Sequence, residues 1–273
     1  MTALSYLSAI HFSGADAGDF LHNQLSADVL GLTSGESTFA CYCEPKGRVL
    51  ALMLVCRFDE GYYVIMAGAL AATIADRLKI YVMRSKVTIE VLTEYSVSGL
   101  QADDAPEVSS TSIVAIQLPH SDKWLVINTG QNRPDTDTPA QDAWKIVELQ
   151  SGISWLCPET SGQFLPQMLG FDQLGAVNYR KGCYPGQEIV ARTHYLGKVK
   201  RHPRLLCANA AICPDPLDVV QIFSGEETYD AVIVDCGHRE DGGTCLMAIT
   251  RMAPDLPAEK IEYCGQIVSL SDL

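Results

Sequence analysis

The spacing of apolar residues changes near residue 203, and this change restricts the folds that the chain can adopt. Before it, a nearly continuous apolar run at residues 49–55 predicts a buried strand, and apolar residues at every fourth position over residues 68–84 predict an amphipathic helix. After it, short apolar runs alternate with Gly, Pro and acidic turns, which is typical of short antiparallel strands. We therefore expect an α+β body of residues 1–202, followed by a small β-barrel of residues 203–273.

Local patterns predict the order of elements. A capping-box pattern at residues 13–16, ahead of Phe20, predicts the start of a short helix. A further helix is expected over residues 142–149, after a polar loop at residues 131–141, whereas residues 157–170 contain helix-breaking prolines and are expected to be irregular. Strands are expected within residues 37–58, 62–66, 87–91, 95–100, 112–118 and 123–128, and, in the barrel, 204–208, 217–223, 229–235, 244–250 and 261–270.

The formal net charge of −13 opposes bulk binding of nucleic acid, because Lys and Arg contacts to phosphate supply most of its non-specific affinity. Residues 192–204 are an exception, since they contain five Lys or Arg and no acid. Three interpretations stay open here: a solvated basic loop, a seat for an anionic ligand such as a glutamate tail, or a site for RNA. No apolar run reaches the roughly 18 residues of a membrane span, and the first residues lack the pattern of a signal peptide, so we expect a cytoplasmic protein.

The ten cysteines do not have the spacing of a zinc ribbon or a thioredoxin-like site, because the sequence has no C-x-x-C pair. Cys41 and Cys43 are the nearest pair and would share one face of a strand, which suits packing as well as ligation. Free cysteines often pack like small apolar residues, so we expect most of the ten to be core thiols in a reducing compartment. We assign no metal ligands.

The densest group of functional residue types is at residues 181–188, with the sequence Lys-Gly-Cys-Tyr-Pro-Gly-Gln-Glu. Its Pro-Gly pair is typical of a type II turn, and the apolar periodicity that follows predicts a helix beginning at Gln187 and Glu188. A thiol beside a Lys and near a helix start, such as Cys183, is in a setting that raises reactivity. These residues alone are also explained by a glycine-rich turn with a buried, inert thiol.

This segment belongs to a longer pattern. The signature of YgfZ-type folate-binding proteins closely resembles residues 161–167 (Ser-Gly-Gln-Phe-Leu-Pro-Gln), residues 179–192 around the segment above, Gly197, and Lys200 with Arg201. Residues 21–29 resemble the N-terminal helix motif of that family, and residues 45–48 resemble its strand–turn motif. The resemblance covers most of residues 15–205, whereas the later residues match by length and β character alone.

The resemblance implies an aminomethyltransferase-like fold, in which three subdomains surround a central channel that binds tetrahydrofolate or a 5-substituted derivative. It also implies that the protein supports iron–sulfur client proteins, including the enzymes that methylthiolate tRNA. The folate-binding residues that it implies are Gln150, Tyr179, Lys181, Cys183, Gln187, Glu188 and Arg192. For Cys183, a redox contact, a transient cluster or metal contact, and simple packing all stay open. Cys183 alone cannot hold an iron–sulfur cluster, because such a cluster normally takes four cysteines.

Two departures from the aminomethyltransferase affect the expected activity. A glutamate of that enzyme holds the pterin, and the matching residue here is Gln150, whose amide both donates and accepts hydrogen bonds. Ala51 and Leu52 stand where acids would be, and neither side chain can move a proton. We therefore expect an accessory protein rather than an enzyme. The alternative, a folate-dependent aminomethyl or one-carbon transferase, would need an acid from another segment, such as Asp28 or Glu44.

Overall fold

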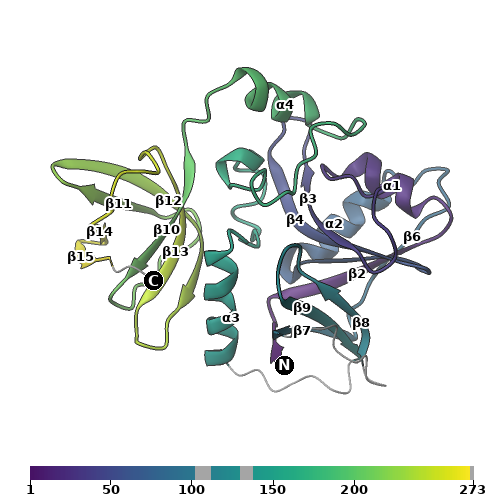
Figure 1. Cartoon of the computed structure of the whole chain (residues 1–273), viewed down its shortest axis with the longest axis horizontal. Helices are drawn as coiled ribbons and strands as arrows, with labels where there is room; N and C mark the ends of the chain where they lie inside the picture. Colours follow the sequence, from purple (N-terminus) through teal and green to yellow (C-terminus); the bar gives the residue numbers. More distant parts are fainter. Residues whose placement is uncertain (102–111, 130–137, 271–273) are drawn as a thin grey trace.

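The structure, a computed structural model, describes residues 1–101, 112–129 and 138–270. The strands in these ranges form three sheets, and the paired strands within each sheet are antiparallel. Figure 1 shows two of the sheets on one side of helix α3 and the third sheet on its other side. The expected α+β class is therefore confirmed. No helix in the described ranges is long and apolar enough to cross a membrane.

A five-stranded sheet, with the order β3-β4-β5-β2-β6, forms the largest part of the body. Its strands are β2 (Leu7–Ser13), β3 (Ser37–Cys43), β4 (Val49–Phe58), β5 (Gly61–Ala67) and β6 (Thr88–Val91). Helices α1 (Ala17–Gln24) and α2 (Gly68–Lys79) pack against it. Leu70, Ile74 and Leu78 of α2 are buried, as their spacing predicts, but the helix ends at Lys79 and is followed by turns instead of continuing to residue 84.

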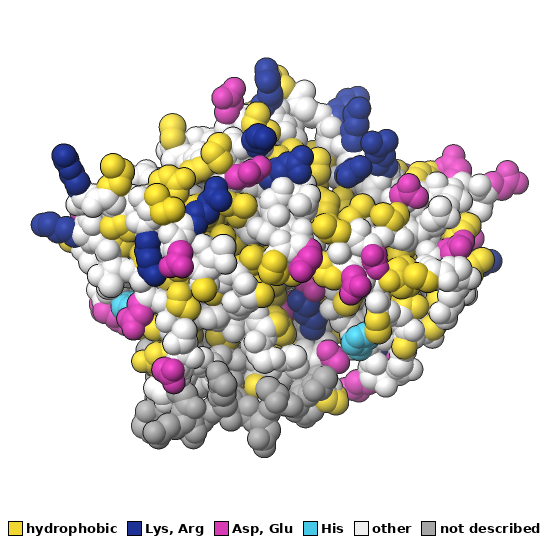
Figure 2. Space-filling view, turned by 180° about the vertical axis from the view of Figure 1, so that it is seen from behind, with side chains coloured by type: hydrophobic (Ala, Val, Ile, Leu, Met, Phe, Trp, Pro, Cys, Tyr) yellow, Lys and Arg dark blue, Asp and Glu magenta, His cyan; other side chains and the backbone are white. Residues whose placement is uncertain are grey.

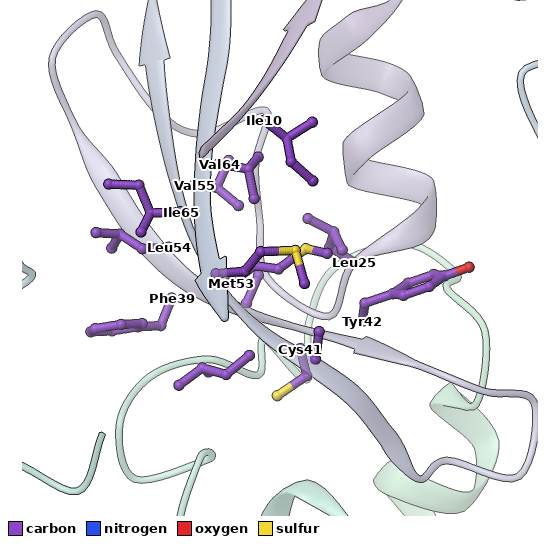
Figure 3. Packing of buried hydrophobic residues seen from close by; sticks show 14 of the residues in the cluster. Ile10, Leu25, Phe39, Cys41, Tyr42, Met53, Leu54, Val55, Val64 and Ile65 are labelled. Carbon is purple, nitrogen blue, oxygen red and sulfur yellow. The ribbon is translucent and has the colours of Figure 1, made fainter. Parts of the chain in front are cut away.

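The main core lies against this sheet. Figure 3 shows Met53 and Val55 of β4 beside Val64 of β5, with Leu25, which follows α1, approaching from another element. All four side chains are buried. Burial of an aliphatic side chain of this size contributes about 1.5–3 kcal/mol relative to leaving it exposed, so the apolar run of β4 fixes this strand in the centre of the body.

A four-stranded sheet, with the order β1-β7-β9-β8, lies next to helix α3 (Thr138–Gln150). Its strands are β1 (Thr2–Ala3), β7 (Tyr95–Gln101), β8 (Ser112–Gln117) and β9 (Lys123–Thr129). Gly99 of β7 lets the helix approach, because a Cβ there would lie 2.7 Å from ring atoms of Trp144. The helix begins at Thr138, four residues earlier than expected, since Pro139 is tolerated in a first turn. Residues 131–137 of the expected loop lie outside the described residues.

The C-terminal sheet has six strands in the order β10-β13-β12-β11-β14-β15. They are β10 (His202–Ala208), β11 (Val219–Ser224), β12 (Glu227–His238), β13 (Thr244–Thr250), β14 (Lys260–Tyr263) and β15 (Gln266–Ser269). The expected strand over residues 261–270 is thus two strands, separated by a turn at Cys264 and Gly265, where φ is positive at both residues. An isolated bridge between Ala208 and Leu270 joins the two edge strands, and a closed barrel is not shown.

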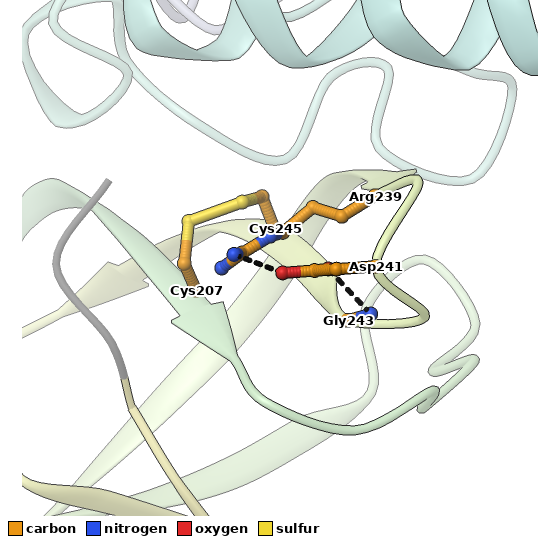
Figure 4. Close-up of a disulfide and its surroundings, with 5 residues drawn as sticks. All are labelled: Cys207, Arg239, Asp241, Gly243 and Cys245. Atoms are coloured by element: carbon orange, nitrogen blue, oxygen red, sulfur yellow. Dashed lines mark hydrogen bonds and ion pairs between the residues drawn. A yellow bond between two sulfur atoms is a disulfide. The ribbon is translucent and has the colours of Figure 1, made fainter.

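The cysteines differ from the expectation that most are core thiols. Cys207 and Cys245 face each other on β10 and β13 and form a disulfide, which Figure 4 shows beside the Arg239–Asp241 ion pair. The free cysteines in the core are Cys41, Cys43 and Cys56. Those on the surface are Cys183, Cys213 and Cys264, and those of intermediate exposure are Cys157 and Cys236.

Candidate functional site

The 181–188 segment forms a tight turn and then starts helix α4 (Gln187–Leu196). The amide of Gln187 donates to the carbonyl of Tyr184 at 3.2 Å, and Gly186 has a φ of 83° at the third position of this turn. This geometry is that of the type II turn predicted from the Pro-Gly pair. Tyr184 is buried, and burial raises the pKa of its phenol. Cys183 and Glu188 are exposed, so the interpretation of Cys183 as a buried thiol is wrong.

Two glycines bring this turn against the strand–turn motif at residues 45–48. A Cβ on Gly186 would lie 2.5 Å from the carbonyl oxygen of Glu44 and 2.7 Å from the Cα of Gly47. A Cβ on Gly47, where φ is 77°, would lie 3.1 Å from the Cβ of Ile189. The two backbones therefore touch directly, which is a contact that glycine alone permits at this separation.

Lys181 attaches the same segment to the N-terminal helix motif. Its ammonium donates to the carbonyl oxygens of His22 and Leu25, the latter at 2.6 Å, at the C-terminal end of α1. Cations are favoured at this end of a helix, where carbonyl groups have no partner within the helix. Burial lowers the pKa of Lys181 to about 8, although the carboxylate of Asp28 opposes the shift. Lys181 thus joins two motifs that are far apart in the sequence.

Gln167, from the motif at residues 161–167, completes the corner. Its side-chain amide donates to the hydroxyl of Tyr179 at 3.1 Å and to the carbonyl of Val190 at 2.8 Å. Ser26 is fully buried nearby, and its hydroxyl donates to the carbonyl of Ala176 at 2.5 Å. The four sequence motifs therefore meet in one packed unit, which we call the signature corner: residues 21–29, 45–48, 161–167 and 179–192.

A separate cavity of about 720 Å³ lies between the three sheets. Phe39 of β3, Leu118 after β8 and Met247 of β13 contribute apolar walls, one from each sheet. Gln150, the exposed last residue of α3, lines this cavity, and so does Lys123, whose ammonium lies 3.5 Å from the Asp122 carboxylate. The cavity combines apolar walls with a few polar groups, which is typical of sites for small organic ligands.

The predicted folate-binding residues are not gathered in one cavity. Gln150 lines the central cavity, whereas Tyr179 lines another of about 450 Å³. A third cavity, of about 700 Å³, shares Leu118–Ser121 with the first and Gly175 with the second, so the three follow one another across the molecule. The remaining predicted residues belong to the signature corner and line none of these three cavities: Lys181, Cys183, Gln187, Glu188 and Arg192.

The positions considered for a catalytic acid are also separated. Ala51 and Leu52 are each 1% exposed within the five-stranded sheet, where they pair with Tyr42 and Cys41 of β3. Asp28 is exposed and lines the 700 Å³ cavity, where its carboxylate lies 3.3 Å from Nδ1 of His22. Burial, the largest effect, and the Lys181 ammonium lower the pKa of His22, while the Asp28 carboxylate raises it.

Sequence reasoning missed a buried charge cluster between α3 and β12. The ammonium of Lys145 lies 2.6 Å from the Asp235 carboxylate, and the buried Glu148 accepts hydrogen bonds from Tyr6 and Trp155 at 2.7 and 2.9 Å. Burial raises the pKa of Asp235 and of Glu148, and the ammonium of Lys145 opposes both shifts. The i, i+3 spacing of Lys145 and Glu148 on one helix face is the one signal in the sequence that could have suggested the cluster.

The chain is similar to proteins of known family and fold. No family model matches it. A protein of Klebsiella pneumoniae (strain 342) named tRNA-modifying protein YgfZ is 30% identical over 271 residues, which cover 89% of this chain and 83% of that protein. Its namesake from Colwellia psychrerythraea is 28% identical and covers 94% of this chain and 87% of that protein. A crystal structure of glycine cleavage system aminomethyltransferase T from Bartonella henselae superimposes with a TM-score of 0.71 at 14% identity, covering 98% of this chain and 83% of that one.

Proposed function

The chain belongs to the family of YgfZ tRNA-modifying proteins and has an aminomethyltransferase-like fold, and from this premise we propose that it is a tetrahydrofolate-binding accessory protein. The ligand is tetrahydrofolate or a 5-substituted derivative, and it occupies the central cavity between the three sheets. The observation that carries this proposal is the cavity of about 720 Å³ with Gln150 at its edge, because that volume lies within the usual range for small-molecule sites.

The side chains around the central cavity suit a folate. A pterin is flat and apolar on its faces, and Phe39, Leu174 and Met247 offer apolar contacts. Its edge alternates donors and acceptors, which the amide of Gln150 can match with a single side chain. The glutamate tail is anionic, and Lys123 is the cation that lines the same cavity. These residues bind and orient the ligand; any one-carbon chemistry is supplied by the folate itself.

The signature corner supports this site from outside it. Lys181 and Tyr179 join three of the motifs through the contacts described above, and the amide of Gln187 closes the turn whose Gly186 touches the fourth, so they act on folate by fixing the surrounding backbone. Cys183 is exposed on this corner and keeps two of its three roles, a redox contact and a transient cluster or metal contact, because packing would need a buried thiol. The division into a folate-binding body of residues 1–202 and a β-domain of residues 203–273 is likewise part of the proposal, and the β-domain adds Met247 to the wall of the folate cavity.

We also propose a role for the protein in tRNA modification. The relatives are named tRNA-modifying proteins, and the resemblance described above implies iron–sulfur clients, including the enzymes that methylthiolate tRNA. The cytoplasmic location expected from the sequence is part of the same proposal. In a bacterium whose own YgfZ gene is deleted, this chain should restore methylthiolated nucleosides in tRNA, measured by mass spectrometry. Equal nucleoside levels with the chain and with an empty vector would contradict the accessory role.

Titration calorimetry with 5-formyltetrahydrofolate tests the folate site. Gln150→Ala should weaken binding by about 3–10-fold, the loss expected for one net hydrogen bond, and Gln150→Glu should tighten it through a charge-assisted bond. The control is Gln221→Ala, which changes an exposed Gln on β11, away from the cavity. Binding that is the same in all three variants would place the ligand elsewhere.

Turnover of tetrahydrofolate with a formaldehyde donor above the uncatalysed rate would favour the one-carbon transferase instead.

A further inference from the structure

The C-terminal end of α4 carries two exposed rings, His194 and Tyr195, beside the half-buried ring of Tyr179. The rings of Tyr179 and His194 are stacked, with centroids 3.8 Å apart and an interplanar angle of 15°. Tyr195 meets both edge-on, at 6.0 Å from Tyr179 and 4.8 Å from His194, and 64% of its surface is exposed. Aromatic rings favour stacked and edge-to-face arrangements, and these contacts hold the three rings in fixed positions.

A cavity of about 450 Å³ lies beside this stack. Tyr179, His194 and Tyr195 line one part of it, and Asn178 and Arg180 line another. The backbone amide of Arg180 donates to the side-chain oxygen of Asn178 at 2.8 Å, which fixes the Asn178 amide next to the rings. A flat ring with polar groups at its edge, such as a nucleobase, is the ligand that aromatic faces and an amide recognise together.

The surrounding surface is strongly basic although the whole chain is anionic. Residues 178–204 contain seven Lys or Arg and one acid, Glu188, in a protein with a net charge of −13. Figure 2 shows Lys and Arg side chains gathered at the upper end of the molecule, where α4 lies in Figure 1. Lys181 and Arg204 bind backbone carbonyls, and the others form no ion pair within the described chain: Arg180, Arg192, Lys198, Lys200 and Arg201.

We infer that this aromatic and basic surface binds a single-stranded segment of RNA, with a base stacked on Tyr195 or His194 and the backbone along residues 198–201. Stacking rings within a positive groove are the two elements that single-strand binding sites share. A nucleic-acid duplex keeps its bases stacked inside, so it would need the basic side chains but not the exposed rings. An acidic protein partner would not need a cavity lined by rings. RNA, rather than DNA, agrees with the naming of the relatives as tRNA-modifying proteins. The inference does not depend on folate binding, because the site is separate from the central cavity.

Fluorescence anisotropy with a labelled, mixed-sequence single-stranded RNA tests the inference. Tyr195→Ala should weaken binding by about 5–150-fold, which is the effect of removing the ring under one stacked base, whereas Tyr195→Trp should retain it. Replacing Lys198, Lys200 and Arg201 together by Ala should also weaken binding and lower the slope of log affinity against log salt by about 2, since each lost phosphate contact on a single strand contributes about 0.7. Tyr195 is exposed, so circular dichroism of its variants should match the parent.

A charge-matched control separates the site from general electrostatics. Lys79, Lys86 and Lys260 are exposed on α2, before β6 and on β14, and replacing all three by Ala changes the net charge equally. This control should bind the RNA like the parent. Equal losses in the two triple variants, or unchanged binding in Tyr195→Ala, would overturn the inference.

Two competitors complete the test. Duplex RNA of the same sequence and heparin should compete more weakly than the single strand, because neither offers an unstacked base. If either competes as strongly as the single strand, the surface binds polyanions through charge alone and the inference is wrong. Saturation with 5-formyltetrahydrofolate should leave RNA affinity unchanged. A failure of folate binding with intact RNA binding would therefore contradict the proposed function alone, and the reverse result would contradict this inference alone.

Discussion

Gly186 is constrained in two ways within the signature corner, by its backbone conformation and by its contact with another segment. It sits at a φ of 83°, a conformation that residues with a side chain rarely adopt, and it also touches the backbone of residues 44–47. Lys181, one of the residues expected to contact a ligand, instead holds the end of α1. At the residue scale, the motif therefore specifies how four segments pack as much as what they bind.

We predict that Gly186→Ala is more destabilising than its backbone conformation alone explains. An Ala at positive φ costs about 1–2 kcal/mol, and the new Cβ would in addition lie 2.5 Å from the carbonyl oxygen of Glu44. Gly242 provides a matched control, because its φ is 84° and no atom of the described residues lies within 4 Å of the position of a Cβ. Urea unfolding should show a larger loss for Gly186→Ala than for Gly242→Ala. Equal losses of stability in the two variants would mean that the backbone of residues 44–47 can move away from the added Cβ.

Helix α3 is the element that connects the parts of the molecule. Trp144 packs on Gly99 of the four-stranded sheet, while Ile146 and Lys145 pack on Gly237 of the six-stranded sheet. The helix ends beside the central cavity with Gln150, and Gly152, at a φ of 75°, turns the chain away. One helix therefore sets both the distance between two sheets and the position of the residue proposed to hold the pterin.

We predict that Lys145→Met destabilises the protein by about 3–5 kcal/mol at pH 8, because it leaves the buried carboxylates of Asp235 and Glu148 without their cation. Burial raises the pKa of both carboxyls in the folded protein. Stabilisation from a raised pKa is present below the ordinary carboxyl value of about 4 and is lost as the pH rises through the raised one. Loss of Lys145 raises both pKa values further, so the destabilisation should be smaller at pH 5 than at pH 8.

The control for this variant is Lys79→Met, which removes an exposed ammonium that pairs with Asp76 at 2.9 Å on α2. An exposed pair contributes about 0–1 kcal/mol, so this variant should lose little stability at either pH. Urea unfolding monitored by tryptophan fluorescence measures both variants. A destabilisation of Lys145→Met that does not change with pH would show that Asp235 and Glu148 are not the groups responsible.

The disulfide joins two neighbouring strands of one sheet. Cys207 and Cys245 are 38 residues apart in sequence and oppose each other on β10 and β13. Cross-links of this kind typically contribute about 2–4 kcal/mol, so Cys207→Ser should lower the stability of the oxidised protein by about that amount. Cys213→Ser, which changes an exposed free thiol, is the control. If a reducing agent leaves the parent as stable as before, the cross-link does not form in solution.

Elements whose signal is local were predicted, and those that depend on distant contacts were not. The helices around Phe20, Leu70 and Gln187 follow from apolar spacing and glycine positions within a few residues. The capping role of residues 13–16 was wrong in detail, because the Asp16 carboxylate accepts from the amide of Lys86 instead of capping α1. Strand β2 was missed, since its apolar residues are interrupted by His11 and flanked by serines. The convergence of the motifs on one corner needed contacts across more than a hundred residues, which no local pattern contains.

At the scale of the whole molecule, the central cavity exists because three sheets face one another around α3. Phe39, Leu118 and Met247 belong to different sheets, or follow them, and line the same space. The fold of the aminomethyltransferase relative covers 98% of this chain, so all three sheets belong to the shared architecture. A site of this kind depends on the C-terminal sheet as well as on the body that carries the sequence signature.

We predict that a chain of residues 1–202 alone does not unfold cooperatively. Removing the C-terminal sheet exposes Leu149, which is 1% exposed in the whole chain and packs with Cys207, Cys245 and Met247. It also removes Asp235, the ion-pair partner of the buried Lys145. The truncated chain should bind a dye such as ANS and show a broad transition, because its helix keeps an apolar face and a charge without a partner. In the full chain, Leu149→Ala should cost about 2–5 kcal/mol and keep a sharp transition, since the sheet remains in place. A truncated chain that unfolds as sharply as the parent, at the same urea concentration, would show that the body is an independent domain.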